Sequence, residues 1–206
     1  MKFDDFDIKE YIDLKATEYD YRLHNEFLRD IIDKFVDLNK ELQNALETVT
    51  YMSITDPLTK IYNRAKFTEE LTKFQEKKQD IYIIMLDIDH FKRVNDTYGH
   101  DSGDYVLKKL CELVNVSIKD DWIFARWGGE EFIIIAQGDE EEIISEAEII
   151  RKRIMNFTFD KVGKITSSFG IASSKGIEEY EKVIKKADLA LYDSKENGRN
   201  RITYNK

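Results

Sequence analysis

The chain has 206 residues, 42% hydrophobic and 35% charged, which suffices for one ordinary domain with an appendage and excludes two full domains. The 41 Asp and Glu residues outnumber the 32 Lys and Arg residues, so the formal net charge is -9 at pH 7. A chain of this charge repels phosphate backbones, which argues against a nucleic-acid binder, and any phosphate ligand has to be held locally by a metal ion or a few cations.

The chain shows neither an export signal nor a membrane span. Residues 1–7 lack the basic and then apolar order of a signal peptide, and the longest apolar run, residues 81–86, is far too short to cross a bilayer. The single cysteine, Cys111, cannot form a disulfide within the chain and lies in an apolar helical pattern. These features predict a protein of the reducing cytoplasm.

Residues 1–52 contain neither proline nor glycine and show an apolar repeat of seven residues. The repeat runs through Leu14, Tyr21, Leu28, Phe35, Leu42 and Val49. Interleaved positions hold Ile32 and Leu46 with Asn39 between them, and an Asn in a coiled-coil core fixes the register of a parallel pair. We predict that residues 1–52 form a helical, coiled-coil stalk that pairs two chains. The alternative is one amphipathic helix packed on its own domain.

The next elements lead from the stalk into a buried strand. Thr55 or Asp56 is predicted to cap a helix with Pro57 in its first turn, and helical spacing continues over residues 64–77. Residues 81–86 form an unbroken apolar run, which predicts a central strand covered on both faces. A short helical piece over residues 91–95 follows, and residues 101–104 open another helix with a capping-box pattern.

The rest of the chain alternates strands with helices around a hairpin. Two strand-like runs, residues 122–127 and 131–136, are joined by Gly128 and Gly129, a pair that suits a tight hairpin turn. A helix over residues 140–156, a strand over 164–173 and a helix over 179–194 follow. Residues 53–206 are therefore predicted to form a ferredoxin-like α+β domain with a central, mostly antiparallel sheet covered by helices.

Carboxylates gather at the expected end of the central strand. Asp87 and Asp89 directly follow its apolar run, and Glu130 and Glu131 follow the glycine pair of the hairpin. If the hairpin lies beside the central strand, Asp87 and Glu130 meet, and converging carboxylates are oxygen ligands suited to Mg²⁺. The alternative is that Asp87 and Asp89 only solvate the end of a buried strand.

Further candidates each have a structural alternative. Lys92 follows the acidic pair, while Lys195 and Arg199 lie at and beyond the end of the last helix, where the helix dipole favours cations. Asp104 takes the place of the acid in a capping box, and Asn95 can simply end a helical turn. The combination is harder to explain by structural roles alone.

The stretch Arg126-Trp-Gly-Gly-Glu-Glu-Phe132 closely resembles the signature of the GGDEF family of bacterial diguanylate cyclases, here in the active variant spelling GGEEF. The similarity covers about residues 53–204 in ordered blocks: Asp56-Pro-Leu-Thr59, Tyr62-Asn-Arg64, Leu86-Asp-Ile-Asp-His-Phe-Lys92, Asn95-Asp-Thr-Tyr-Gly-His100, Gly103-Asp104, Ser168-Phe-Gly-Ile171, Ala187-Asp-Leu-Ala-Leu-Tyr192 and Lys195-Glu-Asn-Gly-Arg-Asn200. So many blocks in one order are far more specific than a single glycine-rich motif.

The resemblance implies that two GTP molecules are condensed into cyclic di-GMP with release of pyrophosphate, on a fold similar to the palm of polymerases and nucleotide cyclases. Each protomer of a homodimer would hold one GTP. Because each GTP attacks the α-phosphate of the other, two half-sites face one another across a two-fold axis. The stalk would then bring the domains together, and the register or rotation of its helices would set the activity.

The resemblance also implies roles for individual residues. Asp87 and Glu130 would ligate Mg²⁺ or Mn²⁺ together with the backbone carbonyl of Ile88, and Glu131 would act as base or organiser near the attacking 3′-hydroxyl. Asn95 and Asp104 would read guanine, because an Asp that accepts from the guanine N1–H and amino group pairs poorly with adenine. The other substrate positions, mostly for phosphate, are His90, Phe91, Lys92, Lys195 and Arg199.

One departure from the family pattern concerns inhibition by the product. Many members carry an Arg-x-x-Asp inhibitory site shortly before the signature, and the matching stretch here is Lys119-Asp-Asp-Trp122. Because Lys119 and Trp122 replace the Arg and the Asp, we predict no strong product inhibition through this site.

Three other functions stay open from the sequence. An inactive receptor for GTP or cyclic di-GMP would normally have lost metal or signature residues, which are all retained here. A cyclase that makes a mixed cyclic dinucleotide is disfavoured by the retained Asp104. A coiled-coil interaction module would leave the carboxylates and cations without a purpose. The activating signal is not encoded visibly, which leaves room for an unidentified regulatory partner.

Overall fold

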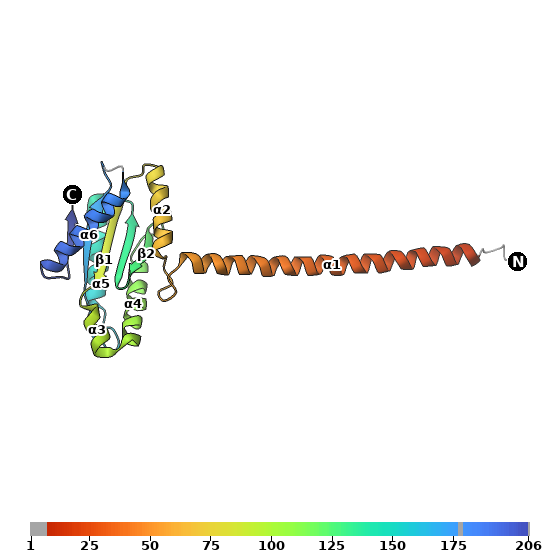
Figure 1. The fold of residues 1–206 in the computed structure, drawn as a ribbon, viewed down its shortest axis with the longest axis horizontal. Helices are drawn as coiled ribbons and strands as arrows, with labels where there is room; N and C mark the ends of the chain where they lie inside the picture. The colour runs from red at the N-terminus through yellow and green to blue at the C-terminus, as the bar shows by residue number, and fades with distance from the viewer. Residues whose placement is uncertain (1–7, 177–178, 206) are drawn as a thin grey trace. The chain divides into compact units, whose positions relative to one another are not determined.

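Figure 1 shows the fold in a computed structural model, which describes residues 8–176 and 179–205, with side chains from residue 13 onward. The chain divides into two units, residues 1–51 and residues 52–206. No helix in the described part of the chain has both the length and the apolar character that crossing a membrane requires.

The described residues of the first unit lie in the helix α1 (Ile8–Ile54), whose last residues, 52–54, belong to the second unit. The predicted N-terminal helix is confirmed from Ile8 onward, and residues 1–7 of the predicted stalk lie outside the described residues. With 1.5 Å per residue, the 47 residues of α1 span about 70 Å. The side chains of the seven-residue repeat, from Leu14 to Val49, are 41–70% exposed. Ion pairs one turn apart, such as Asp30 with Lys34 at 2.7 Å, support the helix along its polar side. A continuous apolar stripe on a long helix is typical of a surface that packs against another helix.

The second unit is built on one five-stranded sheet with the strand order β2-β3-β1-β4-β5. The strands are β1 (Tyr82–Ile88), β2 (Ile123–Gly128), β3 (Glu131–Ala136), β4 (Ser167–Ser173) and β5 (Ile202–Asn205). The central β1 pairs antiparallel with both β3 and β4, and only β5 runs parallel to its neighbour β4. The predicted central, mostly antiparallel sheet is therefore confirmed, and β5 is an additional edge strand that the sequence did not indicate.

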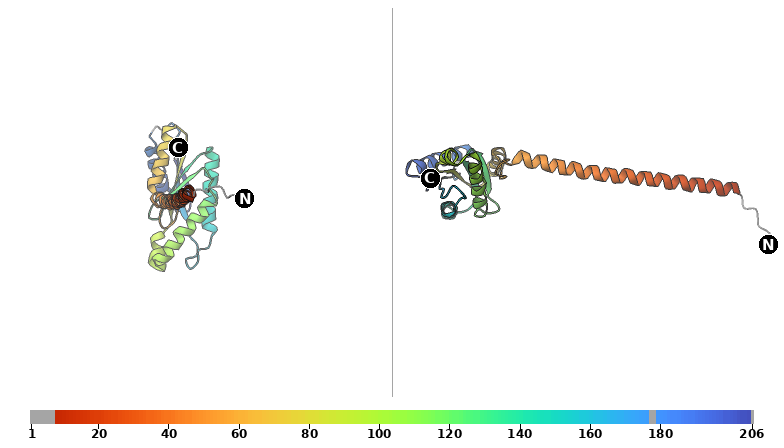
Figure 2. Two further views of the ribbon diagram at one scale, coloured as in Figure 1. Left: turned by 90° about the vertical axis from the view of Figure 1, so that its right-hand side faces the viewer. Right: turned by 90° about the horizontal axis from the view of Figure 1, so that it is seen from below.

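Helices cover both faces of this sheet (Figure 2). They are α2 (Arg64–Glu76), α3 (Phe91–Tyr98), α4 (His100–Asn115), α5 (Glu140–Asn156) and α6 (Tyr180–Glu196). Side chains of α3, α4 and α5 share one apolar core with Ile84 and Leu86 of β1. Side chains of α2 and α6 share the other core with Ile83 and Met85. Because β1 is buried on both faces, its sequence is apolar throughout rather than alternating.

The packing of α6 on β4 depends on Gly170. A Cβ atom at this position would lie 2.2 Å from both the carbonyl oxygen of Ala187 and the backbone nitrogen of Leu191. Only a residue without a side chain therefore lets the backbone of α6 approach the strand so closely. This contact fixes where the C-terminal end of α6, with Lys195, lies relative to β1.

Two predicted helix starts are wrong. α2 begins only at Arg64, where the side chain of Asn63 accepts a hydrogen bond from the backbone N–H of Lys66 at 2.9 Å. Asp56 instead closes a turn, because its Oδ1 accepts from the backbone N–H and the hydroxyl of Thr59 at 2.8 and 2.7 Å. The residues 101–104 form no capping box, since α4 starts at His100 directly after Gly99, which has a φ of 82°.

Candidate active site

The central strand and the hairpin meet at the end of β1. Asp87 lies opposite Glu131 in the antiparallel register, and the backbone N–H of Ile88 faces the carbonyl of Glu130 at 3.4 Å. Opposed residues of an antiparallel pair share one face, so Asp87 and Glu131 point to the same side of the sheet. That side is the α6 side, because Met85, two residues before Asp87, belongs to the core under α6. The pairing thus brings the predicted carboxylates together.

Asp87 is a buried carboxylate with one cationic partner. Nζ of Lys195, in the last turn of α6, lies 2.8 Å from its Oδ2. The pKa of Asp87 is raised to about 6, chiefly by burial and also by the charges of Glu130 and Glu131, while Lys195 acts in the opposite direction. The site therefore carries more negative charge than its lysine neutralises, which favours an additional cation.

The donor set fits a hard divalent cation such as Mg²⁺ or Mn²⁺. Within residues 8–176 and 179–205, no three His, Cys, Asp or Glu side chains are grouped as a complete metal cage. Mg²⁺ commonly takes one or two protein carboxylates and completes its shell with water and substrate phosphates. The Asp87 and Glu130 carboxylates are suited to that use.

The tip of the hairpin is held from one side by Arg126. Its Nε and Nη2 donate to the carbonyl of Gly129 at 3.0 and 2.7 Å, and its Nη1 donates to both oxygens of Asp56 at 3.0 and 3.1 Å. Burial raises the pKa of Asp56, but hydrogen bonds from Thr59 and the charge of Arg126 outweigh it and leave the pKa below its usual value. The turn before α2 and the signature hairpin are therefore tied by an ion pair.

The tip of the hairpin has an unusual backbone. Gly129 has a φ of 37°, in the left-handed region that favours glycine, while Gly128 still belongs to β2. The register between β2 and β3 shifts between Arg126 and Gly128, as in a β-bulge. Such a bulge twists the strand and redirects the side chains next to it. Glu130 and Glu131 follow immediately and are half-buried.

Asn95 and Asp104, the predicted guanine readers, lie on the neighbouring helices α3 and α4. Oδ1 of Asn95 would be only 1.9 Å from a Cβ atom on Gly103, so its amide lies directly against the backbone of α4, one residue before Asp104. Phe91 is buried beneath this contact, with its Cζ 3.2 Å from the same position. Asp104 is exposed, which leaves its carboxylate open to a ligand.

The remaining predicted substrate residues lie on the segments that directly follow β1 and α6. Lys92 is exposed in the first turn of α3, and His90 precedes that helix with a left-handed φ of 58°. Arg199 is half-buried in the turn after α6 and also has a positive φ, 60°. Among the described side chains, neither Lys92 nor Arg199 forms an ion pair with Asp87, Glu130 or Glu131 in the structure.

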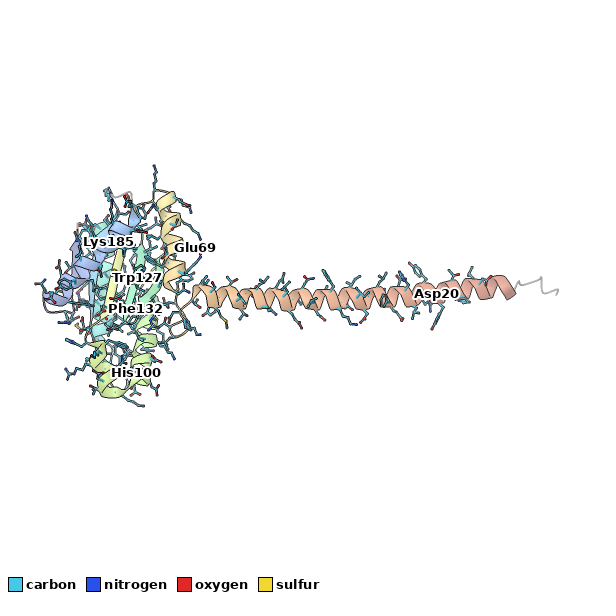
Figure 3. All side chains as sticks on the ribbon, in the orientation of Figure 1. Asp20, Glu69, His100, Trp127, Phe132 and Lys185 are labelled. Carbon is cyan, nitrogen blue, oxygen red and sulfur yellow. The ribbon has the colours of Figure 1, made fainter. Side chains whose placement is uncertain are left out.

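A cleft of about 790 Å³ opens between α2 and α6 on the same side of the sheet as Asp87. Arg64, Trp127, Glu131 and Lys185 are among its lining residues, and Figure 3 labels Trp127 in the hairpin and Lys185 on α6. The Arg64 guanidinium stacks on the Trp127 ring at 4.0 Å from its centroid. Glu131 lines the cleft and lies opposite Asp87 at the end of β1, so the cleft reaches this side of the strand end.

Sequence reasoning missed the role of Asp89. β1 ends at Ile88, and the buried carboxylate of Asp89 accepts hydrogen bonds from Thr166 Oγ1 and Ser168 Oγ, both at 2.6 Å, and from the backbone N–H of Asn200 at 3.0 Å. Its partners lie 77 to 111 residues further along the chain. The Asp-x-Asp spacing was the only sequence signal, and it does not distinguish an aspartate that could bind a cation from one that accepts hydrogen bonds from the chain itself.

Residues 119–122, which stand where other family members carry the inhibitory Arg-x-x-Asp pair, make structural contacts. Trp122 is buried, and its indole Nε1 donates to the carbonyl of Gln137 at 3.3 Å. Lys119 forms an ion pair with Glu142 of α5. Neither side chain has the acceptor and donor pattern of the Arg-x-x-Asp pair.

Comparison with known proteins gives consistent matches. A family model described as "Diguanylate cyclase, GGDEF domain" matches residues 53–201. The chain is similar to the diguanylate cyclase VdcA of Vibrio cholerae serotype O1, with 33% identity over 196 residues that cover 92% of this chain and 58% of that protein. This chain thus spans little more than half the length of that relative.

Two solved structures are similar as well. The coiled coil and GGDEF domain of DgcB from Caulobacter crescentus in complex with c-di-GMP has a TM-score of 0.78 and 33% identity, covering 86% of this chain and 98% of that one. The active GGEEF domain of a diguanylate cyclase from Vibrio cholerae has a TM-score of 0.65 and 34% identity, covering 70% of this chain and 97% of that one.

Proposed function

This chain belongs to the diguanylate cyclase family defined by the GGDEF domain, and on that premise we propose that it condenses two GTP molecules into cyclic di-GMP and two pyrophosphates. The observation that carries the proposal is the meeting of buried Asp87 with the Gly-Gly-Glu-Glu hairpin and Lys195 at one strand end. The likeness to a solved domain described as an active GGEEF domain supports activity with the signature spelled this way.

Mg²⁺ or Mn²⁺ would be held by the carboxylates of Asp87 and Glu130 and the backbone carbonyl of Ile88. The excess negative charge around Asp87 supports this assignment. A bound cation would supply positive charge that neutralises the phosphates and lowers the pKa of the attacking 3′-hydroxyl. The residues of this chain then position the nucleotide around that charge.

The cationic side chains hold the triphosphate, and Glu131 handles the nucleophile. Lys92, Lys195 and Arg199 supply positive charge to phosphate oxygens, which the net charge of the chain does not provide. Glu131 faces the same side as Asp87 and orients the 3′-hydroxyl or accepts its proton. Displacement at the α-phosphate forms the new phosphodiester bond and releases pyrophosphate.

Asn95 and Asp104 select guanine. The Asp104 carboxylate accepts from N1–H and the exocyclic amino group, whereas adenine offers no donor at N1 and leaves the carboxylate unpaired. The close approach of Asn95 to Gly103 supports a preformed pocket wall beside Asp104. A cyclase with this pocket makes cyclic di-GMP rather than a mixed dinucleotide, and replacing Asp104 with Ser tests this with ATP and GTP supplied together.

Two chains are required, because each bound GTP attacks the other. The apolar repeat of α1 is the surface that we assign to this homodimer, in a parallel coiled coil. Its exposure of 41–70% supports the assignment, since apolar side chains so exposed gain from burial against a second helix. An unidentified partner that acts on α1 would then change activity through the same helix.

We expect no strong product inhibition through residues 119–122. Buried Trp122 and paired Lys119 offer no substitute for an Arg-x-x-Asp pair. Titration of the nucleotide-free protein with cyclic di-GMP should show no nanomolar binding. Nanomolar affinity that survives substitution of the active-site residues would contradict this expectation.

The proposed activity is tested by incubating purified protein with GTP and Mg²⁺ and separating the nucleotides by chromatography. The unaltered chain and the control Glu141→Ala, an exposed residue on α5, should produce cyclic di-GMP, whereas Glu130→Ala should not. A dimeric sample that binds GTP without forming the product would favour the receptor function instead.

A further inference from the structure

The turn between α6 and β5 has an unusual backbone. After Gly198, with a φ of 107°, Arg199 and Asn200 take φ values of 60° and 46°. Two successive residues with side chains in the left-handed region are disfavoured by their Cβ atoms, although Asn tolerates it better than Arg. Such a conformation persists only where surrounding contacts fix it. This turn carries Arg199, one of the cations assigned to phosphate.

Asp89 fixes the turn from the β1 side. Its Oδ2 accepts the backbone N–H of Asn200 at 3.0 Å and the hydroxyl of Thr166 at 2.6 Å, while its Oδ1 accepts the hydroxyl of Ser168 at 2.6 Å. The Asp89 backbone N–H donates to the carbonyl of Thr166 at 2.9 Å. The side chain is 6% exposed, so these bonds are shielded from water.

Arg151 of α5 fixes the same turn from another side. Its Nη1 donates to the carbonyl oxygen and to Oδ1 of Asn200 at 3.2 and 2.6 Å. Glu148 holds the guanidinium in place with two bonds of 2.7 Å. The backbone N–H of Arg199 also donates to the carbonyl of Ser194 at 2.9 Å. The residue next to Arg199 is thus bound by two elements far apart in the sequence.

We propose that Asp89 is a positioning residue of the phosphate site, which acts by fixing the turn between α6 and β5 so that Arg199 is preorganised for the triphosphate of GTP. The inference rests on the proposed function of Arg199. Both oxygens of Asp89 already accept hydrogen bonds from groups of the chain, which makes them poor candidates for a metal ion. The two aspartates of the Asp-x-Asp pattern therefore have different roles: Asp87 binds the cation, and Asp89 fixes the turn.

A double-mutant cycle tests whether Asp89 acts through Arg199. Asp89→Ala, Arg199→Ala and the double variant are compared by calorimetric binding of a non-hydrolysable GTP analogue with Mg²⁺, and by KM and kcat. Loss of one charged phosphate contact should weaken binding about tenfold or more. We expect Asp89→Ala to raise Kd and KM by a similar factor and the double variant to be no weaker than Arg199→Ala. If the increases in Kd and KM of the two single variants multiply in the double variant, the two residues act independently, which would overturn the proposal.

Two further variants distinguish a positioning role of Asp89 from a general loss of folding. Asp89→Asn keeps the shape and one acceptor oxygen, so it should recover part of the loss. Arg151→Gln removes the second anchor and leaves Asp89 intact, and its effect should likewise vanish in an Arg199→Ala background. If Asp89→Ala is poorly folded, the Arg151→Gln cycle carries the test, and multiplying factors there would overturn the proposal.

The Mg²⁺ dependence provides an independent readout. The Mg²⁺ concentration for half-maximal activity should be unchanged in Asp89→Ala, and a tenfold rise would identify Asp89 as a metal ligand and contradict the inference. If the unaltered chain neither binds the analogue nor forms product, the proposed function itself fails. If the unaltered chain binds the analogue and forms product, but the effects of the single variants multiply in the double variants, only the positioning role of Asp89 fails.

Discussion

The helix α1 and the domain of residues 52–206 bury their apolar side chains very differently. In the domain, large core residues such as Phe67, Phe132 and Phe169 are fully buried. In α1, Phe35 and Leu42 of the apolar repeat are 64% and 57% exposed. The domain therefore buries its own apolar side chains, whereas α1 exposes an apolar surface of the kind that packs against another helix. The difference suggests that chemistry resides in the domain and assembly in α1, and that mutations can separate them.

The largest effect is expected inside the domain, at Asp87. Asp87→Ala removes the proposed metal ligand and the partner of Lys195, so activity should fall by about 1000-fold or more, since metal catalysis contributes several kcal/mol. The mass measured by light scattering should stay that of a dimer. Cyclic di-GMP formation within tenfold of the unaltered chain would break the assignment of chemistry to this strand end.

The next effect is expected on α1. Phe35→Lys combined with Leu42→Lys places charges in the apolar repeat, which should yield a monomer and reduce activity about 100-fold at micromolar concentration. Asp37→Lys, on an exposed position outside the repeat, is the matched control and should change neither property. The unfolding temperature of the domain should be unchanged in both. A dimeric, active double variant would refute the role of α1.

A smaller effect is expected at Gly103. In Gly103→Ala the new Cβ would lie 1.9 Å from Oδ1 of Asn95 and must displace that amide from the proposed guanine site. KM for GTP should rise about tenfold, the size expected for one lost hydrogen bond to the base, with a smaller change in kcat. Asp101→Ala, exposed in the same helical turn, should leave KM unchanged. An unchanged KM in Gly103→Ala would remove Asn95 from base recognition.

The last prediction concerns chemical reactivity in the core under α4 rather than enzymatic activity. Burial raises the pKa of the Cys111 thiol to about 12, so the folded chain disfavours the thiolate. The buried, protonated thiol contributes fully to the stability of the fold below the ordinary pKa of 9.0. This contribution is lost as the pH rises from 9.0 toward 12, because the unfolded chain then releases the proton while the folded chain retains it. At pH 8 the only cysteine should react with a thiol reagent about 100-fold more slowly than in urea, whereas equal rates would show that this core opens readily.

Local patterns predicted the elements but not the contacts between them. The run from Ile81 to Leu86 identified the central strand because both of its faces are covered, and the glycine pair identified the hairpin. Asp56 was misread as a helix cap because its partner, Arg126, lies 70 residues away. β5 was missed because its four residues form a strand only by pairing with β4.

The site was predicted to a similar extent. The sequence placed Asp87 and Glu130 at one strand end, and the hydrogen bond from the backbone N–H of Ile88 to the carbonyl of Glu130 explains how their segments meet. The fit of Asn95 against Gly103 and the network around Asp89 depend on how α4 and the turn after α6 pack, which spacing along the chain does not encode.

We propose that this chain makes cyclic di-GMP only when α1 pairs two domains. It is tested most directly by measuring mass by light scattering and cyclic di-GMP formation from GTP and Mg²⁺ on the same sample, for the unaltered chain and for Phe35→Lys with Leu42→Lys. We expect a dimer that forms the product and a monomeric variant that is about 100-fold less active. A monomer that forms cyclic di-GMP at the full rate would contradict it.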